Sequence, residues 1–230
     1  MATRLFLTLV PMGFLLTGIR LANCHGEENA PAATQWMSLF DGKTLAGWKN
    51  SEFGGDGEIA VEDGAIDLGM GAVLTGVTYN GDHELPKLDY EIRLQAKRIN
   101  GNDFFCGLTV PYKDSHISLI IGGWGGGLVG LSSLNNHDAS ENETSSYRAF
   151  QNGQWYRIRL RVQEERIEAW IDEEQVVKCQ VRNRTISTRP EVDLSKPLGL
   201  SAFQTRAALR DIELRRLDAN DDKARQDKAK

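Results

Sequence analysis

A strict two-residue alternation of apolar and polar side chains is the feature that most constrains how this chain folds. Residues 88–96 alternate without a break, residues 156–162 alternate apolar side chains with three arginines, and residues 211–215 place two aliphatic side chains between charged ones. Such alternation is typical of β-strands with one buried and one solvated face. The pattern predicts that Arg93, Arg159 and Glu213 are exposed. It predicts as buried the residues Tyr90, Ile92, Leu94, Ile158, Leu160 and Ile212.

The rest of the chain, from residue 36 to 217, also favours strands. Short apolar runs separated by turn residues predict further strands at 58–61, 65–69, 72–79, 103–111, 115–122, 127–133, 176–181 and 197–203. Residues 164–175 predict a hairpin that turns at 172–174, and no segment shows a sustained helical period. Many short strands with glycine-rich turns are typical of a sandwich. We therefore expect an all-β, single-domain protein built from two antiparallel sheets.

The N-terminal segment predicts export. Arg4 precedes the uncharged, mostly apolar stretch 5–19, which Arg20 ends, and this pattern is typical of a secretory signal peptide. A buried N-terminal helix is the alternative. The stretch 21–24 ends in Cys24 and faintly resembles a lipoprotein box, but Asn23 is too large and polar for the position before a lipidated cysteine, so a lipid-anchored form is less favoured. We expect a signal peptide over 1–24, a linker over 25–35, the sandwich over 36–217 and a charged, disordered tail over 218–230. The mature chain is then secreted or periplasmic, with no integral membrane segment.

Charge and cysteine content narrow the classes of partner. The net charge of −5 argues against a basic groove for nucleic acid. Cys24 leaves with the signal peptide or is modified, so two cysteines remain, Cys106 and Cys179. Both lie in apolar, strand-like runs. They form either one disulfide or two buried thiols.

The segment 39–48 carries a more specific pattern. Phe40, Asp41, Gly42, Lys43, Leu45, Gly47 and Trp48 closely resemble the opening motif of the bacterial 3-keto-disaccharide hydrolase-like domains. Segments 61–66, 153–158, 167–177 and 209–217 resemble later strands of the same family, so the resemblance covers about 36–217. It implies a concanavalin A- or laminin-G-like jelly roll, with carbohydrate on the concave sheet or at its rim. The motif itself is expected to be structural, with Gly42 in a turn and Trp48 packed at the sandwich edge.

Residues 100–150 contain the greatest concentration of reactive and unusual side chains. His116 and Ser118 share one face of a predicted strand, a face too polar for a core. Trp124 lies among glycines, where its ring either stacks on a sugar or plugs the core. The glycine run lacks the Gly-Lys-Ser/Thr ending and the following helix of a phosphate loop. His116 is either a reactive group or a hydrogen-bonded structural histidine.

Three carboxylates, Asp138, Glu141 and Glu143, lie within six positions. They predict either a solvated acidic loop, a general acid/base pair or a site for a hard cation. Their spacing does not match the Glu-x-Asp-x-x-Glu strand of laminarinase-like sandwich enzymes, so a retaining glycosidase of that kind is disfavoured.

The family resemblance implies a different reaction, cleavage of glycosides that carry a ketone at C3. The ketone acidifies the C2 hydrogen, so the reaction needs a base near neutral pH and a positive group beside the enolate. The catalytic candidates are His116, Asp138, Glu141, Glu143 and Arg148, and the substrate-binding candidates are Asp103, Ser118, Trp124 and Tyr147. The sequence names no cofactor, and a divalent cation is one candidate for the group that stabilises the enolate. The expected partner is a carbohydrate or small glycoside. A non-catalytic carbohydrate- or partner-binding sandwich and a surface structural protein are the alternatives.

Overall fold

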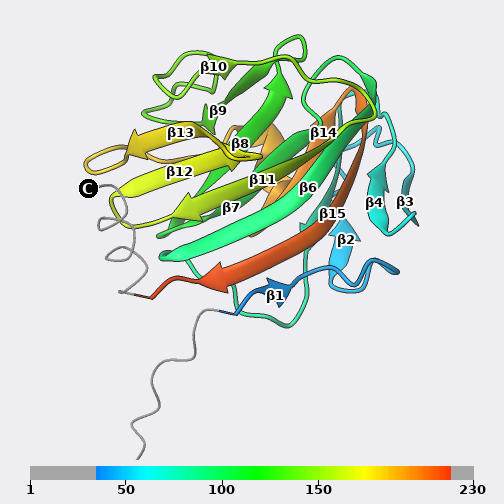
Figure 1. The fold of residues 1–230 in the computed structure, drawn as a ribbon, viewed down its shortest axis with the longest axis horizontal. Coiled ribbons are helices and arrows are strands. Elements are labelled where there is room, and N and C mark those ends of the chain that lie inside the picture. The colour runs from blue at the N-terminus through cyan, green and yellow to red at the C-terminus, as the bar shows by residue number, and fades with distance from the viewer. Residues whose placement is uncertain (1–34, 219–230) are drawn as a thin grey trace, which may run out of the picture. The chain divides into compact units, whose positions relative to one another are not determined.

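The computed structural model describes residues 35–218, which form two antiparallel sheets packed face to face (Figure 1). The 8-stranded sheet, which faces the viewer, has the order β13 (Glu174–Gln180), β12 (Arg166–Ile171), β11 (Trp155–Val162), β6 (Tyr90–Gly101), β15 (Thr205–Arg216), β4 (Ala65–Leu68) and β3 (Ile59–Glu62), with β1 (Met37–Ser38) also paired to β15. The 7-stranded sheet has the order β10 (Ser146–Tyr147), β9 (Leu128–Ser132), β8 (Ser115–Gly123), β7 (Cys106–Tyr112), β14 (Gly199–Phe203), β5 (Leu74–Tyr79) and β2 (Trp48–Asn50). A short 3-10 helix, η1 (Pro190–Ser195), precedes β14. The predicted all-β sandwich is confirmed.

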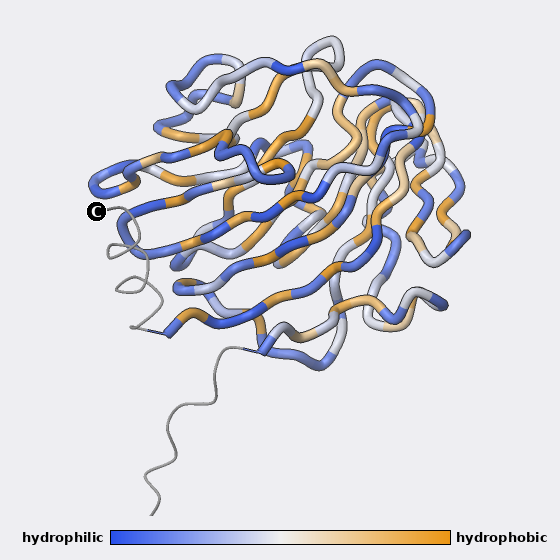
Figure 2. The backbone as a smooth tube through the Cα atoms, viewed as in Figure 1, coloured by the Kyte–Doolittle hydropathy of each residue, from blue (hydrophilic) through white to orange (hydrophobic). Residues whose placement is uncertain are grey.

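The core lies between the two sheets and is filled by the alternating apolar residues. All six residues predicted to be buried are at most 1% exposed. Figure 2 shows the alternation as changes between hydrophilic and hydrophobic colour along the strands of the front sheet. Arg93 is exposed as predicted, whereas Arg159 and Glu213 are half-buried. The two-residue period therefore fixes which side chains enter the core, as expected for a sandwich.

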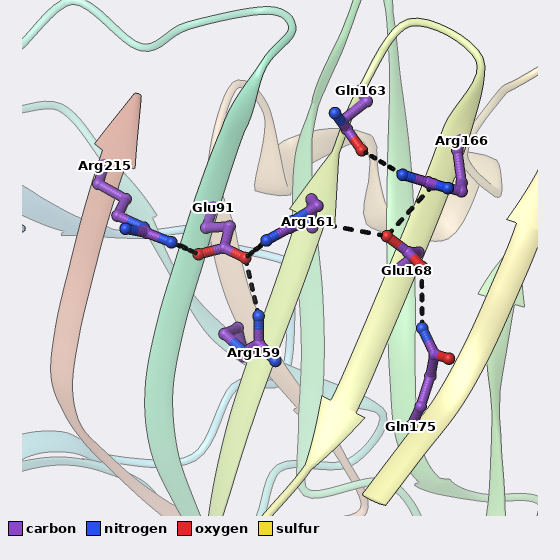
Figure 3. A network of polar contacts seen from close by, with 8 residues as sticks. All are labelled: Glu91, Arg159, Arg161, Gln163, Arg166, Glu168, Gln175 and Arg215. Atoms are coloured by element: carbon purple, nitrogen blue, oxygen red, sulfur yellow. Dashed lines mark hydrogen bonds and ion pairs between the residues drawn. The ribbon is translucent and has the colours of Figure 1, made fainter. Parts of the chain in front are cut away.

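Polar side chains on the outer face of the 8-stranded sheet, the face away from the core, form a network (Figure 3). Glu91 is fully buried, and its Oε1 accepts hydrogen bonds from Arg159 and Arg161, each at 2.8 Å. Its Oε2 accepts one from Arg215 at 2.6 Å. Arg161 is only 2% exposed, because Glu91 and the nearby ring of Trp170 cover a side chain that alternation alone predicts as solvated.

The charges of this network set the pKa of Glu91. Burial alone raises the pKa of this carboxyl, but the attraction of Arg161 and the hydrogen bonds from Arg215 and Arg161 lower it further than burial raises it. The pKa of Glu91 therefore lies below its ordinary value, and the carboxylate stays ionised at neutral pH.

The opening motif has the predicted structural role. Gly42 adopts a positive φ of 73°, and Trp48 begins β2, the edge strand of its sheet. The Trp48 side chain is 4% exposed. Its Nε1 donates a hydrogen bond to the carbonyl of Leu39 at 2.8 Å, and its ring packs edge-on against Tyr79. Through Trp48, the motif packs the start of the domain against the core.

The two cysteines of the sandwich are buried free thiols. Cys106 lies in β7 and Cys179 in β13, so they belong to different sheets. Burial raises the pKa of Cys106 to about 12, which keeps its thiol protonated and unreactive.

Several interpretations of the sequence lie outside the described residues. These are the signal peptide, the lipoprotein box, nearly all of the linker and the charged tail from residue 219 onward. Within 35–218, the chain has no helix with the length and apolar character needed to cross a membrane.

Candidate functional site

The outer face of the 7-stranded sheet carries unusually small side chains. One row of register partners crosses five neighbouring strands, and it consists of Thr78, Gly199, Thr109, Ser118 and Ser132. Most of their neighbours along the strands are apolar residues of the core, such as Val77, Leu108 and Leu119, so alternation directs this row away from the core. A sheet face of this kind leaves space above it for other segments or for a ligand.

The segment around η1 packs over part of this face. A Cβ on Gly199 would lie only 2.4 Å from the carbonyl oxygen of Ser195, so only glycine allows this close approach. Thr78 Oγ1 donates a hydrogen bond to the carbonyl of Leu194 at 2.6 Å. These contacts hold η1 against β14 and β5.

Beside η1 the face is open and forms a cavity of about 340 Å³. Its lining residues are Val73, Leu74, Asp103, Phe104, Ser118, Ile120, Trp124, Ser132, Arg189, Glu191, Val192 and Phe203. The walls are mostly aliphatic and aromatic, and a small number of polar groups converge among them. Val73 and Trp124 are 47% and 42% exposed, and they form an apolar rim. A pocket of this size and composition is typical of a small-molecule site.

Arg189 supplies the positive charge in the cavity. Its Nη1 pairs with Asp138 Oδ2 at 2.9 Å, and its Nη2 pairs with Glu191 Oε1 at 2.8 Å. The hydrogen bond to Glu191 raises the pKa of Arg189, and the same bond lowers the pKa of Glu191. Ser140 donates two hydrogen bonds to Asp138 Oδ1, through its backbone N–H and its hydroxyl. The guanidinium is therefore held in place from two sides.

Three of the substrate-binding candidates, Asp103, Ser118 and Trp124, line this cavity. Asp103 Oδ1 accepts the backbone N–H of Phe104 at 2.7 Å, and its Oδ2 accepts that of Gly125 at 3.3 Å. The carboxylate thus ties the turn that carries Trp124 to the loop before β7. Trp124 adopts a positive φ of 46°, in a turn bounded by glycines.

His116 lies on the same sheet face as Ser118 but is not among the lining residues. It is half-buried near the end of η1. Burial lowers the pKa of His116, nearby Lys196 lowers it further, and Asp193 acts in the opposite direction. The imidazole is thus neutral at pH 7, and His116 lies outside the cavity lining.

The remaining candidates lie away from the cavity lining. Glu141 is exposed, and Glu143 forms an ion pair with Arg184. Arg148 pairs with Glu174 of the other sheet, at 3.4 Å. Tyr147, in β10, is 70% exposed. Of the acidic cluster, Asp138 alone reaches the site, through its contact with Arg189.

Sequence reasoning missed Ser132, Arg189, Glu191 and the aromatic wall formed by Phe104 and Phe203. Arg189 and Glu191 flank a proline in a stretch without alternation, so no period marked them. Ser132 occupies the position across from Ser118 in register, which only strand pairing reveals. Among residues 35–218, no group of three or more His, Cys, Asp or Glu side chains is arranged to hold a metal ion.

Solved structures with a similar fold include a β-glucanase and a transglycosylase. A Bacillus licheniformis β-glucanase matches with a TM-score of 0.53 at 8% identity, over 82% of this chain and all of the glucanase chain. The Crh5 transglycosylase matches with a TM-score of 0.52 at 10% identity, over 82% of this chain and 85% of its own. A Bacillus subtilis protein of unknown function with a galectin-like fold gives 0.52 at 10% identity, over 74% and 89%. At such identities the likeness is one of fold.

A comparison with curated protein sequences gives no match. The family model described as the 3-keto-alpha-glucoside-1,2-lyase-like domain matches residues 35–215, which is nearly the whole described sandwich. This match agrees with the resemblance of the opening motif and of the later strands. The chain therefore belongs to the family of 3-keto-alpha-glucoside-1,2-lyase-like domains.

Proposed function

We infer that the cavity on the 7-stranded sheet binds a glycoside and that the domain cleaves glycosides carrying a ketone at C3. The observation that carries this proposal is Arg189, a cation held in the cavity wall by Asp138 and Glu191. Family membership supports the substrate class, and the fold shared with a glucanase and a transglycosylase supports a carbohydrate ligand.

The reaction would proceed by elimination followed by hydration. A base takes the C2 proton, and the electrons of the C2–H bond form an enolate whose negative charge lies on the C3 oxygen. When the ketone re-forms, the substituent at C1 leaves and a C1–C2 double bond remains. Water then adds across this double bond. The protein must supply a base and must stabilise the enolate.

The residues of the cavity fit these two tasks. Arg189 presents a fixed guanidinium, which would stabilise the enolate oxygen without reorganising. Glu191 is the carboxylate beside it, and it is ionised at neutral pH, so it would take the proton. The hydrogen bond from Arg189 that lowers its pKa also makes it a weaker base. Asp138 would act as a positioning residue that orients Arg189. Trp124 and the aromatic wall would hold the sugar ring and its substituent.

The assay compares a 3-keto-glucoside with the corresponding plain glucoside, both carrying a chromogenic leaving group, with and without a chelator. We expect release of the leaving group from the 3-keto-glucoside only. Glu191→Gln and Arg189→Gln should each lower the rate about a hundredfold or more. Glu213→Gln is a matched control, because Glu213 pairs with one arginine, Arg93, but on the other sheet. Equal rates in all variants would contradict the assignment.

A non-catalytic binding module is the second candidate, and the hydrogen bonding of the cavity carboxylates favours it. Both oxygens of Asp103 accept backbone N–H groups, and Glu191 is paired with Arg189. In such a module these carboxylates shape the site and take no proton. Binding of a glucoside with no release of the leaving group from its 3-keto form would establish this second function.

A further inference from the structure

The cavity is polar at one end and apolar at the other. Ser118 and Ile120 point to the same side of β8, so they lie about 7 Å apart along the strand. Ser118 and its register partner Ser132 form the polar end of the sheet floor. Beyond Ile120, Leu74 and its register partner Phe203 form an apolar end. A ligand with one polar and one apolar part matches this gradient.

The two serines of the polar end differ in their hydrogen bonding. Ser118 Oγ lies 2.8 Å from Thr109 Oγ1, so these two hydroxyl groups form a hydrogen bond with each other. Ser132 is 2% exposed, and its Oγ has no hydrogen-bond partner within residues 35–218. A buried hydroxyl without a partner lowers stability, and proteins seldom retain one without a reason. Because Ser132 lines the cavity, a bound molecule can supply the missing partner.

We propose that Ser132 hydrogen-bonds one ring hydroxyl of the bound sugar and thereby determines which sugars the site accepts. This inference rests on the proposed glycoside function and adds an orientation to it. The sugar ring occupies the end with Ser132 and Arg189, and the leaving group points along the strands toward Leu74, Phe104 and Phe203. The preferred substrate class is therefore a glycoside with an apolar or aromatic leaving group.

The choice between binding orientations follows from desolvation. The carboxylate of Asp103 lines the cavity beside Phe104, but both of its oxygens already accept backbone N–H groups. A sugar hydroxyl placed against the Phe104 and Phe203 rings would therefore lose its water for little gain. Placed against Ser132, the same hydroxyl forms a hydrogen bond that gives both the sugar hydroxyl and the buried serine hydroxyl a partner. An aromatic leaving group gains from the apolar end, where the Phe104 and Phe203 rings lie 5.8 Å apart.

The test measures the dissociation constant of para-nitrophenyl glucoside and of its monodeoxy analogues by calorimetry. Ser132→Ala should weaken binding of the parent glucoside about tenfold, the effect of one hydrogen bond. One deoxy analogue should lose the same factor with the unchanged protein and lose nothing further with Ser132→Ala. Ser195→Ala is the matched control, because Ser195 is also fully buried with no partner for its Oγ among the described residues, yet does not line the cavity. Both variants should melt at or above the temperature of the unchanged protein.

The outcomes separate this inference from the function on which it rests. If the unchanged protein binds the glucoside and Ser132→Ala binds every analogue equally well, the role of Ser132 is wrong and glycoside binding stands. If the unchanged protein binds neither this glucoside nor its 3-keto form, both proposals fail. Methyl glucoside tests the orientation. Phe203→Ala should weaken binding of para-nitrophenyl glucoside more than that of methyl glucoside, whereas equal weakening would overturn the placement of the leaving group.

Discussion

At the scale of single residues, Glu91 shows how a buried charge depends on its neighbours. It accepts hydrogen bonds from Arg159, Arg161 and Arg215, and Arg161 is itself buried (Figure 3). If Glu91 becomes neutral, the three guanidiniums lose the carboxylate that they share, and the carboxylate of Glu168 lies farther from Arg161, at 4.0 Å. Removing one partner from a buried ion pair typically costs about 3–5 kcal/mol. Glu91 therefore stabilises the outer face of its sheet by keeping three cations together.

The corresponding prediction uses Glu91→Gln, with Glu213→Gln as control. Glu91→Gln should lower the free energy of unfolding by about 3–5 kcal/mol, measured with denaturant at pH 7. Glu213→Gln, which breaks a partly exposed pair with Arg93, should cost about 1 kcal/mol or less. Similar losses in both variants would contradict the role assigned to Glu91.

Because the pKa of Glu91 is lowered in the folded protein, the stability of the fold depends on pH. Its folded pKa lies below the unfolded value of about 4.3, so its contribution is complete above that value and is lost as the pH falls through the folded pKa. Stability of the unchanged protein should therefore decrease more steeply below about pH 4 than stability of Glu91→Gln. Parallel curves would contradict this.

At the scale of elements, η1 determines the chemistry of the cavity. It carries Glu191 and Val192 and follows Arg189, and it reaches the sheet because Gly199 leaves space for the Ser195 carbonyl. Gly199→Ala should shift η1, lower stability by about 1–3 kcal/mol and weaken glycoside binding. The control is Gly153→Ala, whose Cβ would meet nothing within 4 Å, although its φ of +83° costs some backbone strain of its own. Unaltered binding in Gly199→Ala would mean that η1 does not shape the site.

The elements also show which parts of the fold could be predicted from the sequence and which could not. Strand β6 was predictable because apolar and polar side chains alternate along its consecutive residues. Short strands such as β10, and η1, were not, because their conformation depends on contacts with distant strands. The site divides in the same way. Ser118 and Trp124 stand out locally, whereas Arg189 approaches the cavity only through packing of η1, and burial of Arg161 depends on Glu91, far away in the sequence.

At the scale of the whole molecule, the order of the strands places late segments inside both sheets. Strand β15 lies between β6 and β4 (Figure 1). In the other sheet, β14 lies between β7 and β5. Strands β4, β5, β6 and β7 therefore each lack one neighbour until β14 and β15 have been made. Contacts between such distant segments also make folding slow, because a long loop must close before they form.

Neither sheet can thus become continuous in a nascent chain before β14 and β15 have been synthesised. A chain ending at residue 198 should show no cooperative unfolding transition by circular dichroism, although it contains most of the strands. A cooperative transition in that fragment would show that the early strands form a stable unit alone.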